Sequence, residues 1–206
     1  MARGKAKSPE DMRRHIVATA MTMAERDGWR PVTMAGISRE SGISLPQLLS
    51  LMANKACILG GLARQIDETV LSDLAKDGET GDTPKDRLFD ILMRRFDALS
   101  QYKGGLAAVV HGLPGDPVTG VWQMLRLHCS MAMTLEAAEI PSAGIAGLLR
   151  TKGLTLVFAN ACRVWFRDDS EDMSATMAAI DRGLSLADRI VAKCAAAKYN
   201  PTEPQN

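Results

Sequence analysis

Residues 33–52, TMAGISRESGISLPQLLSLM, decide how this sequence folds. Thr33 is a favoured helix N-cap, and Gly42 can adopt the left-handed conformation that ends a short helix in a sharp turn. Ser44 can then cap a second short helix, in which Pro46 falls in the first turn, where a missing N–H costs little. Two short helices joined by a glycine turn predict a helix-turn-helix.

Outward from this segment, apolar residues recur at helical spacing, as at Ile16, Val17 and Ala20, and no stretch shows convincing period-two alternation. Proline after Ser8 and after Thr83 marks two helix starts. The aromatic fraction of 4% and the 12 methionines suit aliphatic helix packing. We expect an all-α protein of about nine helices, at 9–27, 34–41, 45–52, 55–77, 84–101, 104–112, 117–138, 143–167 and 171–197.

The composition is that of an ordinary globular protein. Of 206 residues, 46% are hydrophobic and 24% charged, which excludes a disordered chain or a disulfide framework. No run of 18 apolar residues occurs, so we expect a cytoplasmic protein. The cysteines are far apart in apolar helical stretches and predict buried free thiols, with no metal site and no cofactor: Cys57, Cys129, Cys162 and Cys194.

Charge is distributed unevenly along the chain. Residues 1–56 carry nine Lys or Arg against five Asp or Glu, a net charge of +4, and the remainder has a net charge of −3. A basic front suits contact with a polyanion, although basic arms are also common on solvated termini. The sequence divides into a helix-turn-helix head at 1–56, a helical body at 57–199 and a flexible tail at 200–206.

The order and spacing of residues in the head resemble the N-terminal domain of TetR-family (tetracycline-repressor-like) transcriptional regulators. The matching positions are Ile16-x-x-x-Ala20, Gly28-Trp29, Thr33, Ile37, Gly42-Ile43-Ser44, Leu48 and Asn54-Lys55-x-x-x-Leu59. The resemblance implies a DNA-binding head on a ligand-binding body that dimerises through its last two long helices. It also implies DNA contacts at Thr33, Ser44, Leu45, Gln47, Leu49 and Lys55, with Thr33 and Lys55 on phosphates.

The second short helix departs from that family pattern at two places. Leu49 stands where the family usually has a phosphate-binding tyrosine, and Leu51-Met52 replace a polar residue or histidine and a phenylalanine. Helical spacing places Leu48, Leu51 and Met52 toward the core, and Leu45 and Leu49 outside with Gln47 and Ser50. These outer leucines can contact thymine methyls or form an apolar protein-contact patch.

Three segments of the body are similar to the accessory lipid-binding proteins of ubiquinone biosynthesis, which share the TetR fold. They are residues 86–97, 164–170 and 177–184. This second resemblance implies an alternative function, namely binding of a lipid or isoprenoid beside a hydroxylase partner by a head that no longer binds DNA.

Both resemblances imply a cavity for a hydrophobic effector among the body helices, with His128 as its polar group, although such side chains are also common in plain cores. The residues expected to line it are Phe89, Met93, Phe96, Trp122, Leu125, His128, Phe158, Cys162 and Trp165. A dimer face is expected at Leu148, Leu154, Val157, Ala161, Met177, Ile180, Leu184, Ala187 and Ile190.

The sequence contains no G-x-S-x-G, H-E-x-x-H, Walker or dinucleotide glycine motif, which argues against an enzyme. We therefore interpret the chain as a homodimeric, ligand-responsive regulator that binds a double-stranded DNA operator as a repressor, with the lipid-binding accessory role as the alternative.

Overall fold

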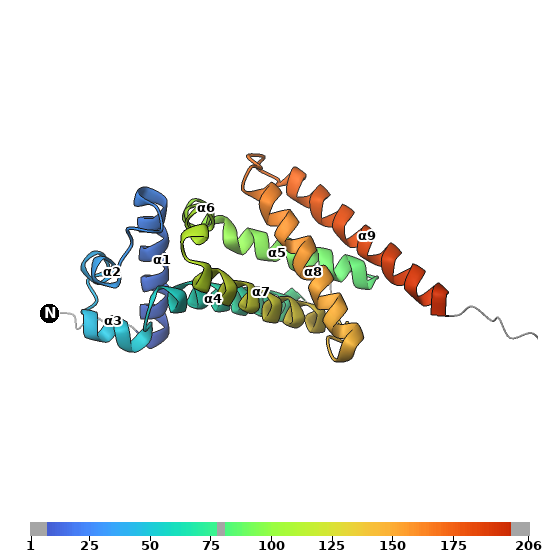
Figure 1. Cartoon of the computed structure of the whole chain (residues 1–206), viewed down its shortest axis with the longest axis horizontal. Helices are drawn as coiled ribbons and strands as arrows, with labels where there is room; N and C mark the ends of the chain where they lie inside the picture. The colour runs from blue at the N-terminus through green and yellow to red at the C-terminus, as the bar shows by residue number, and fades with distance from the viewer. Residues whose placement is uncertain (1–7, 78–80, 199–206) are drawn as a thin grey trace, which may run out of the picture. The chain divides into compact units, whose positions relative to one another are not determined.

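The computed structural model describes residues 8–77 and 81–198, with side chains to residue 190. Over these residues the chain is all-α, with nine α-helices, one 3-10 turn and no strand (Figure 1). The helices are α1 (Pro9–Asp27), α2 (Met34–Ser41), α3 (Leu45–Leu51), α4 (Lys55–Asp77), α5 (Pro84–Ser100), α6 (Lys103–Gly112), α7 (Pro117–Ala137), α8 (Gly144–Trp165) and α9 (Ser174–Lys198). The basic residues expected on the N-terminal arm, the tail and Cys194 lie outside this description.

The expected helices agree with the observed ones to within three residues at every end. The largest difference is at α9, which begins at Ser174 rather than at residue 171. Ser170 and Asp172 lie just outside the helix, and their side chains each accept a hydrogen bond from the Ser174 N–H at 3.1 Å. These two side chains therefore cap α9 from outside the helix.

The chain forms two compact units. The first, here called the head-bearing unit, comprises residues 1–76 and 94–130, and the second, the C-terminal unit, comprises residues 77–93 and 131–206. The unit that contains the head thus also includes α4, α6 and parts of α5 and α7.

Helix α1 is the core of the head-bearing unit. Its capping box pairs the Ser8 side chain with the Asp11 N–H at 3.0 Å, and the expected apolar stripe, including Ile16 and Ala20, is buried. Helix α6 packs closely on α1 at Gly105, where an added Cβ would lie 2.6 Å from the carbonyl oxygen of Met21. Only glycine permits this close approach of the two backbones.

A buried ion pair connects α4, α5 and α7 in the same unit. The Arg95 guanidinium donates to the Asp67 carboxylate at 2.6 Å and to the Ser130 hydroxyl at 2.8 Å. Ser130 in turn donates to Asp67 at 2.6 Å. Loss of one member of such a buried pair leaves an uncompensated charge, so each of the three side chains is expected to be important for stability.

In the C-terminal unit, α8 and α9 pack side by side as an antiparallel pair (Figure 1). Their shared core corrects part of the expected dimer face, because four of its residues are buried within the chain: Leu154, Ala161, Ile180 and Leu184. Helical periodicity places these residues on the buried faces of α8 and α9 and turns a different set outward. The exposed apolar residues of the pair are Ile145, Leu148, Leu149, Leu156, Leu186 and Ile190.

The expectation of buried thiols is wrong for the three cysteines whose side chains are described. They are free, but Cys57 and Cys162 are half-buried and Cys129 is exposed. Cys129 follows Leu125 by one helical turn on the outer face of α7, which the apolar composition of the helix did not distinguish from its inner face.

No described helix is both long and apolar enough to cross a membrane. Among the described residues, no group of three or more His, Cys, Asp or Glu is arranged to hold a metal ion.

Candidate functional site

The turn between α2 and α3 forms as the sequence predicts. The Thr33 hydroxyl accepts a hydrogen bond from the Gly36 N–H at 3.0 Å and so caps α2. Gly42 ends the helix with a φ of +70°, a conformation that strains any residue with a Cβ. Ser38 then donates to the carbonyl oxygen of Ile43 at 2.7 Å, which fixes the path of the chain into α3.

Helix α3 is held on the head by one face and presents the other to solvent. Leu48 and Met52 are 0% and 5% exposed, so the core face predicted from helical spacing is confirmed. Leu45 and Leu49 are 37% and 41% exposed, as expected for the outer face. Leu51, expected in the core, is half-buried.

Ser44 occupies the N-cap position of α3, but its side chain makes no capping hydrogen bond, which corrects the expected cap. An N-cap side chain bonds to the second or third N–H of a helix. Pro46 is the second helical residue and has no N–H, so only one of the two donors remains. The Ser44 hydroxyl therefore remains exposed on the surface of the head.

The polar side chains of α3 lie on its exposed face. Gln47 approaches α1, where its Nε2 lies 3.2 Å from the Met12 sulfur, a weak acceptor. Ser50 donates to the carbonyl oxygen of Gln47 at 2.7 Å. This weak contact holds the Gln47 amide beside α1, and a stronger hydrogen-bond acceptor can replace the Met12 sulfur.

Lys55 has a structural contact that its sequence pattern did not reveal. Its ammonium donates to the carbonyl oxygen of Trp29 at 2.6 Å and lies 4.4 Å from the centre of the Trp29 ring. Burial lowers the pKa of Lys55, and the nearby Asp116 carboxylate partly opposes that change. A lysine ammonium has three donors, so a phosphate contact by Lys55 stays a prediction alongside this internal one.

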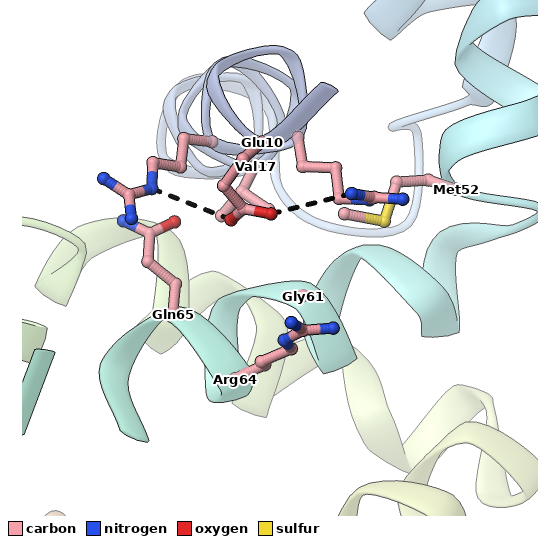
Figure 2. Close-up of a pocket in the computed structure, with 8 residues that line it drawn as sticks. Glu10, Val17, Met52, Gly61, Arg64 and Gln65 are labelled. Atoms are coloured by element: carbon pink, nitrogen blue, oxygen red, sulfur yellow. Dashed lines mark ion pairs between the residues drawn. The ribbon is translucent and has the colours of Figure 1, made fainter. Parts of the chain in front are cut away.

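Two arginines near the start of α1 lie beside the carboxylate of Glu10. The Glu10 carboxylate lies 3.6 Å from Arg13 and 3.7 Å from Arg14, and both arginine side chains are 40% or more exposed. Figure 2 shows Glu10 in a cleft between α1 and α4, with Met52 on one side and Gln65 on the other. The cleft has room of about 20 Å³, which suits a water molecule rather than an organic effector. Sequence analysis missed this cluster, although the spacing of Glu10, Arg13 and Arg14 along one helix face was its signal.

Two further cations of the head are Arg26 and Arg39. Arg26 forms ion pairs with Asp27 at 2.8 Å and with Glu40 at 3.1 Å, and hydrogen bonds to these carboxylates raise its pKa. Arg39, on α2, is exposed. Arg26 therefore links α1 to α2 through its ion pairs.

The residues expected at the DNA contact all belong to the head-bearing unit. Five are exposed, namely Thr33, Ser44, Leu45, Gln47 and Leu49, and Lys55 is half-buried. Helical spacing places Leu45 and Leu49 side by side on one flank of the exposed surface of α3 and Gln47 on the other flank.

The residues expected around an effector are distributed over both units. Phe96, Phe158 and Trp165 are buried, and Phe89, Met93, His128 and Cys162 are half-buried. Trp122 and Leu125, on α7, are 58% and 55% exposed. The effector site stays a prediction, and the cleft in Figure 2 contains none of these nine residues.

No protein-family profile and no curated protein matches the sequence. Solved structures do match the fold. A TetR transcriptional regulator from Nitrosomonas europaea ATCC 19718 has a TM-score of 0.70 and 21% identity, covering 86% of this chain and 98% of that one. A TetR transcriptional regulator from Rhodococcus sp. RHA1 has a TM-score of 0.61 and 16% identity, covering 87% of this chain and 97% of that one.

A third structure, described as a TetR-family transcriptional regulator from Rhodococcus sp., has a TM-score of 0.57 and 14% identity, covering 84% of this chain and 99% of that one. At these identities the likeness establishes the fold, and the chain has a TetR-like fold.

Proposed function

We propose that this chain, with its TetR-like fold, is a DNA-binding transcriptional regulator whose helix α3 enters the major groove. The observation that carries the proposal is the orientation of α3: Leu48 fixes it to the head, while Leu45, Gln47 and Leu49 face solvent. A helix held in this way on a basic head is what groove insertion requires.

Phosphate contacts would supply most of the affinity. Residues 1–56 have a net charge of +4, and the sequence of residues 1–7 contains three cations and no acid. Thr33 and Lys55 lie at the two ends of the helix-turn-helix, before α2 and at the start of α4. Phosphate contacts position a protein on the duplex without specifying its sequence, which leaves sequence recognition to α3.

The proposed regulator acts as a two-fold dimer. Paired heads bind half-sites about 34–36 Å apart, one helical turn of DNA. The exposed apolar face of α8, with Ile145, Leu149 and Leu156 at 82%, 64% and 71% exposure, supports a subunit contact in the C-terminal unit. The three residues recur at helical spacing on one side of α8, and a second copy of the chain can cover such a face.

The effector is proposed to be apolar, and its binding is proposed to relieve repression. An effector that binds the body and changes the distance between paired heads would reduce operator affinity without altering either head. The test is extraction of the purified protein followed by mass spectrometry, together with thermal shift assays using added lipids. A co-purified hydrophobic compound that releases DNA supports this role, and the absence of both a compound and a shift contradicts it.

DNA binding is tested by gel shift of the full-length protein on duplexes from the flanks of its own coding region, repeated over a salt series. Specific binding with several phosphate contacts loses affinity steeply as salt rises. Arg39→Ala should weaken binding and lower the salt slope by about one, the value for a single phosphate contact. Arg182→Ala, at an exposed position of α9 in the C-terminal unit, serves as the control.

Flat, weak and sequence-indifferent binding would contradict the proposal. It would instead favour the lipid-binding accessory function, in which the exposed Leu45 and Leu49 form a protein-contact patch.

A further inference from the structure

The exposed surface of α3 has an unusual chemistry for a helix on a basic head. Its sequence, LPQLLSL, contains no charged residue. Ser50 already donates its hydroxyl to the carbonyl oxygen of Gln47, so Gln47 carries the main hydrogen-bonding side chain of this surface. Leu45 and Leu49 supply most of its exposed apolar area, at 37% and 41% exposure.

The cations lie around α3 rather than on it. Arg13 and Arg14 belong to α1, Arg39 to α2 and Lys55 to α4. A duplex has the complementary arrangement, with phosphates along the edges of the major groove and uncharged base edges on its floor. This match of a neutral centre with cationic flanks favours a DNA groove as the occupant of the surface.

We infer that Leu45 and Leu49 select thymine in the operator half-site by contacting its 5-methyl group, an inference that rests on the proposed function. Thymine is the one base that presents a methyl group in the major groove. Leucine offers only apolar contact, which matches that methyl and nothing else on the groove floor.

Selection against the other bases follows from desolvation. Guanine, cytosine and adenine present donors and acceptors at their major-groove edges. A leucine that covers these groups removes water without replacing its hydrogen bonds, which is unfavourable. Gln47 lies between the two leucines in sequence and has the amide geometry that pairs with adenine N6 and N7.

The spacing of the two leucines sets the spacing of the methyl groups. Residues four apart in an α-helix lie on the same face and about 6 Å apart along its axis. Base pairs are about 3.4 Å apart along the duplex. Each half-site should therefore contain two methyl-sensitive thymines within about two base-pair steps, in an A·T-rich segment.

The experiment begins with selection of binding duplexes from a random library by the full-length protein. Each thymine of the selected half-site is then replaced singly by deoxyuridine, which keeps base pairing and removes only the methyl group. We expect about fourfold weaker binding at two neighbouring positions, the value of one buried methyl group, and no change elsewhere. Leu45→Ala should abolish the sensitivity at one of these positions and Leu49→Ala at the other.

Leu71→Ala is the matched control, because Leu71 is a leucine of α4 with 45% exposure. Binding by Leu71→Ala should still weaken when the methyl group is removed at either of the two sensitive thymine positions. Binding that ignores every thymine-to-uracil change, or a sensitivity that persists in both leucine variants, overturns this inference and leaves the proposed function intact. Failure to enrich any duplex, with no salt-dependent binding, overturns the proposed function and this inference with it.

Discussion

Helices α3 and α8 both expose leucines, but in different settings. On α3, Leu45 and Leu49 are interspersed with Gln47 and Ser50, on a head with a net charge of +4. On α8, Leu149 and Leu156 are more exposed, at 64% and 71%. The contrast shows that exposed apolar area alone does not identify a partner. The neutral surface of α3 on a basic head favours a polyanion there, whereas the more exposed leucines of α8, which share their face with Lys152, favour a subunit contact.

Replacement of adjacent leucines in α3 gives the largest expected effects. Leu48 is fully buried, so Leu48→Ala should lower the free energy of unfolding by about 2–5 kcal/mol. Leu49→Ala should change it by no more than about 0.5 kcal/mol, as is usual at an exposed position. Urea unfolding measures both, and equal losses would mean that the outer face of α3 is covered within the chain.

A charge placed on the outer face of α8 tests whether that face is a subunit interface. Leu156→Glu would occur twice in a two-fold interface, so dimerisation should weaken at least tenfold, or by about 1.4 kcal/mol. Sedimentation at micromolar concentration should then show a monomer. Leu49→Glu is the control and should leave the dimer intact, whereas a dimer that survives Leu156→Glu would place the interface elsewhere.

The two regions also differ in how their helices are capped. Asp168 accepts hydrogen bonds from the N–H and hydroxyl of Thr176 at 2.8 and 2.6 Å and so anchors the start of α9. Asp168→Ala should therefore destabilise the protein by about 1 kcal/mol, the usual value of a cap. Ser44→Ala should have almost no effect on thermal unfolding, because the Ser44 side chain makes no capping bond. A comparable loss at Ser44 would contradict this contrast.

The same cap predicts a pH dependence of smaller size. Hydrogen bonds donated by Ser170 and then by Thr176 hold the pKa of Asp168 far below its ordinary value. A lowered folded-state pKa contributes stability above the unfolded value of about 3.9 and loses it as the pH falls further. Unfolding curves should therefore show Asp168→Asn and the wild type converging in stability below about pH 4. A stability difference between the two proteins that stays constant down to pH 2 would contradict the assignment of this pH dependence to Asp168.

Sequence reasoning succeeded where a helix meets its partner nearby in the chain. In the head, one period of apolar residues identified both the buried Leu48 and the exposed Leu49, because α1 and α2 cover α3 within some forty residues. For α8 and α9, the same periodicity predicts which helix faces are apolar, but it does not predict which helix or subunit covers them. Leu154 and Ile180 were assigned to a second subunit, but they pack within the chain.

Contacts that depend on tertiary geometry were also beyond the sequence. Nothing in the pattern around Lys55 indicated that its ammonium would reach the carbonyl oxygen of Trp29, 26 positions away. The buried ion pair of Asp67 with Arg95 was missed for the same reason, since the two residues lie on different helices.

A carboxylate placed on the outer face of α3 tests the proposed DNA contact of that face. Leu49→Glu and Leu71→Glu make the same change at similar exposure, and Leu71 lies about 24 Å along α4 from its start. Fluorescence anisotropy with a selected duplex compares their affinities. Leu49→Glu should weaken binding more than tenfold, because a carboxylate then faces the polyanion, while Leu71→Glu should stay within about twofold of the wild type. Equal affinities for the two variants would contradict it.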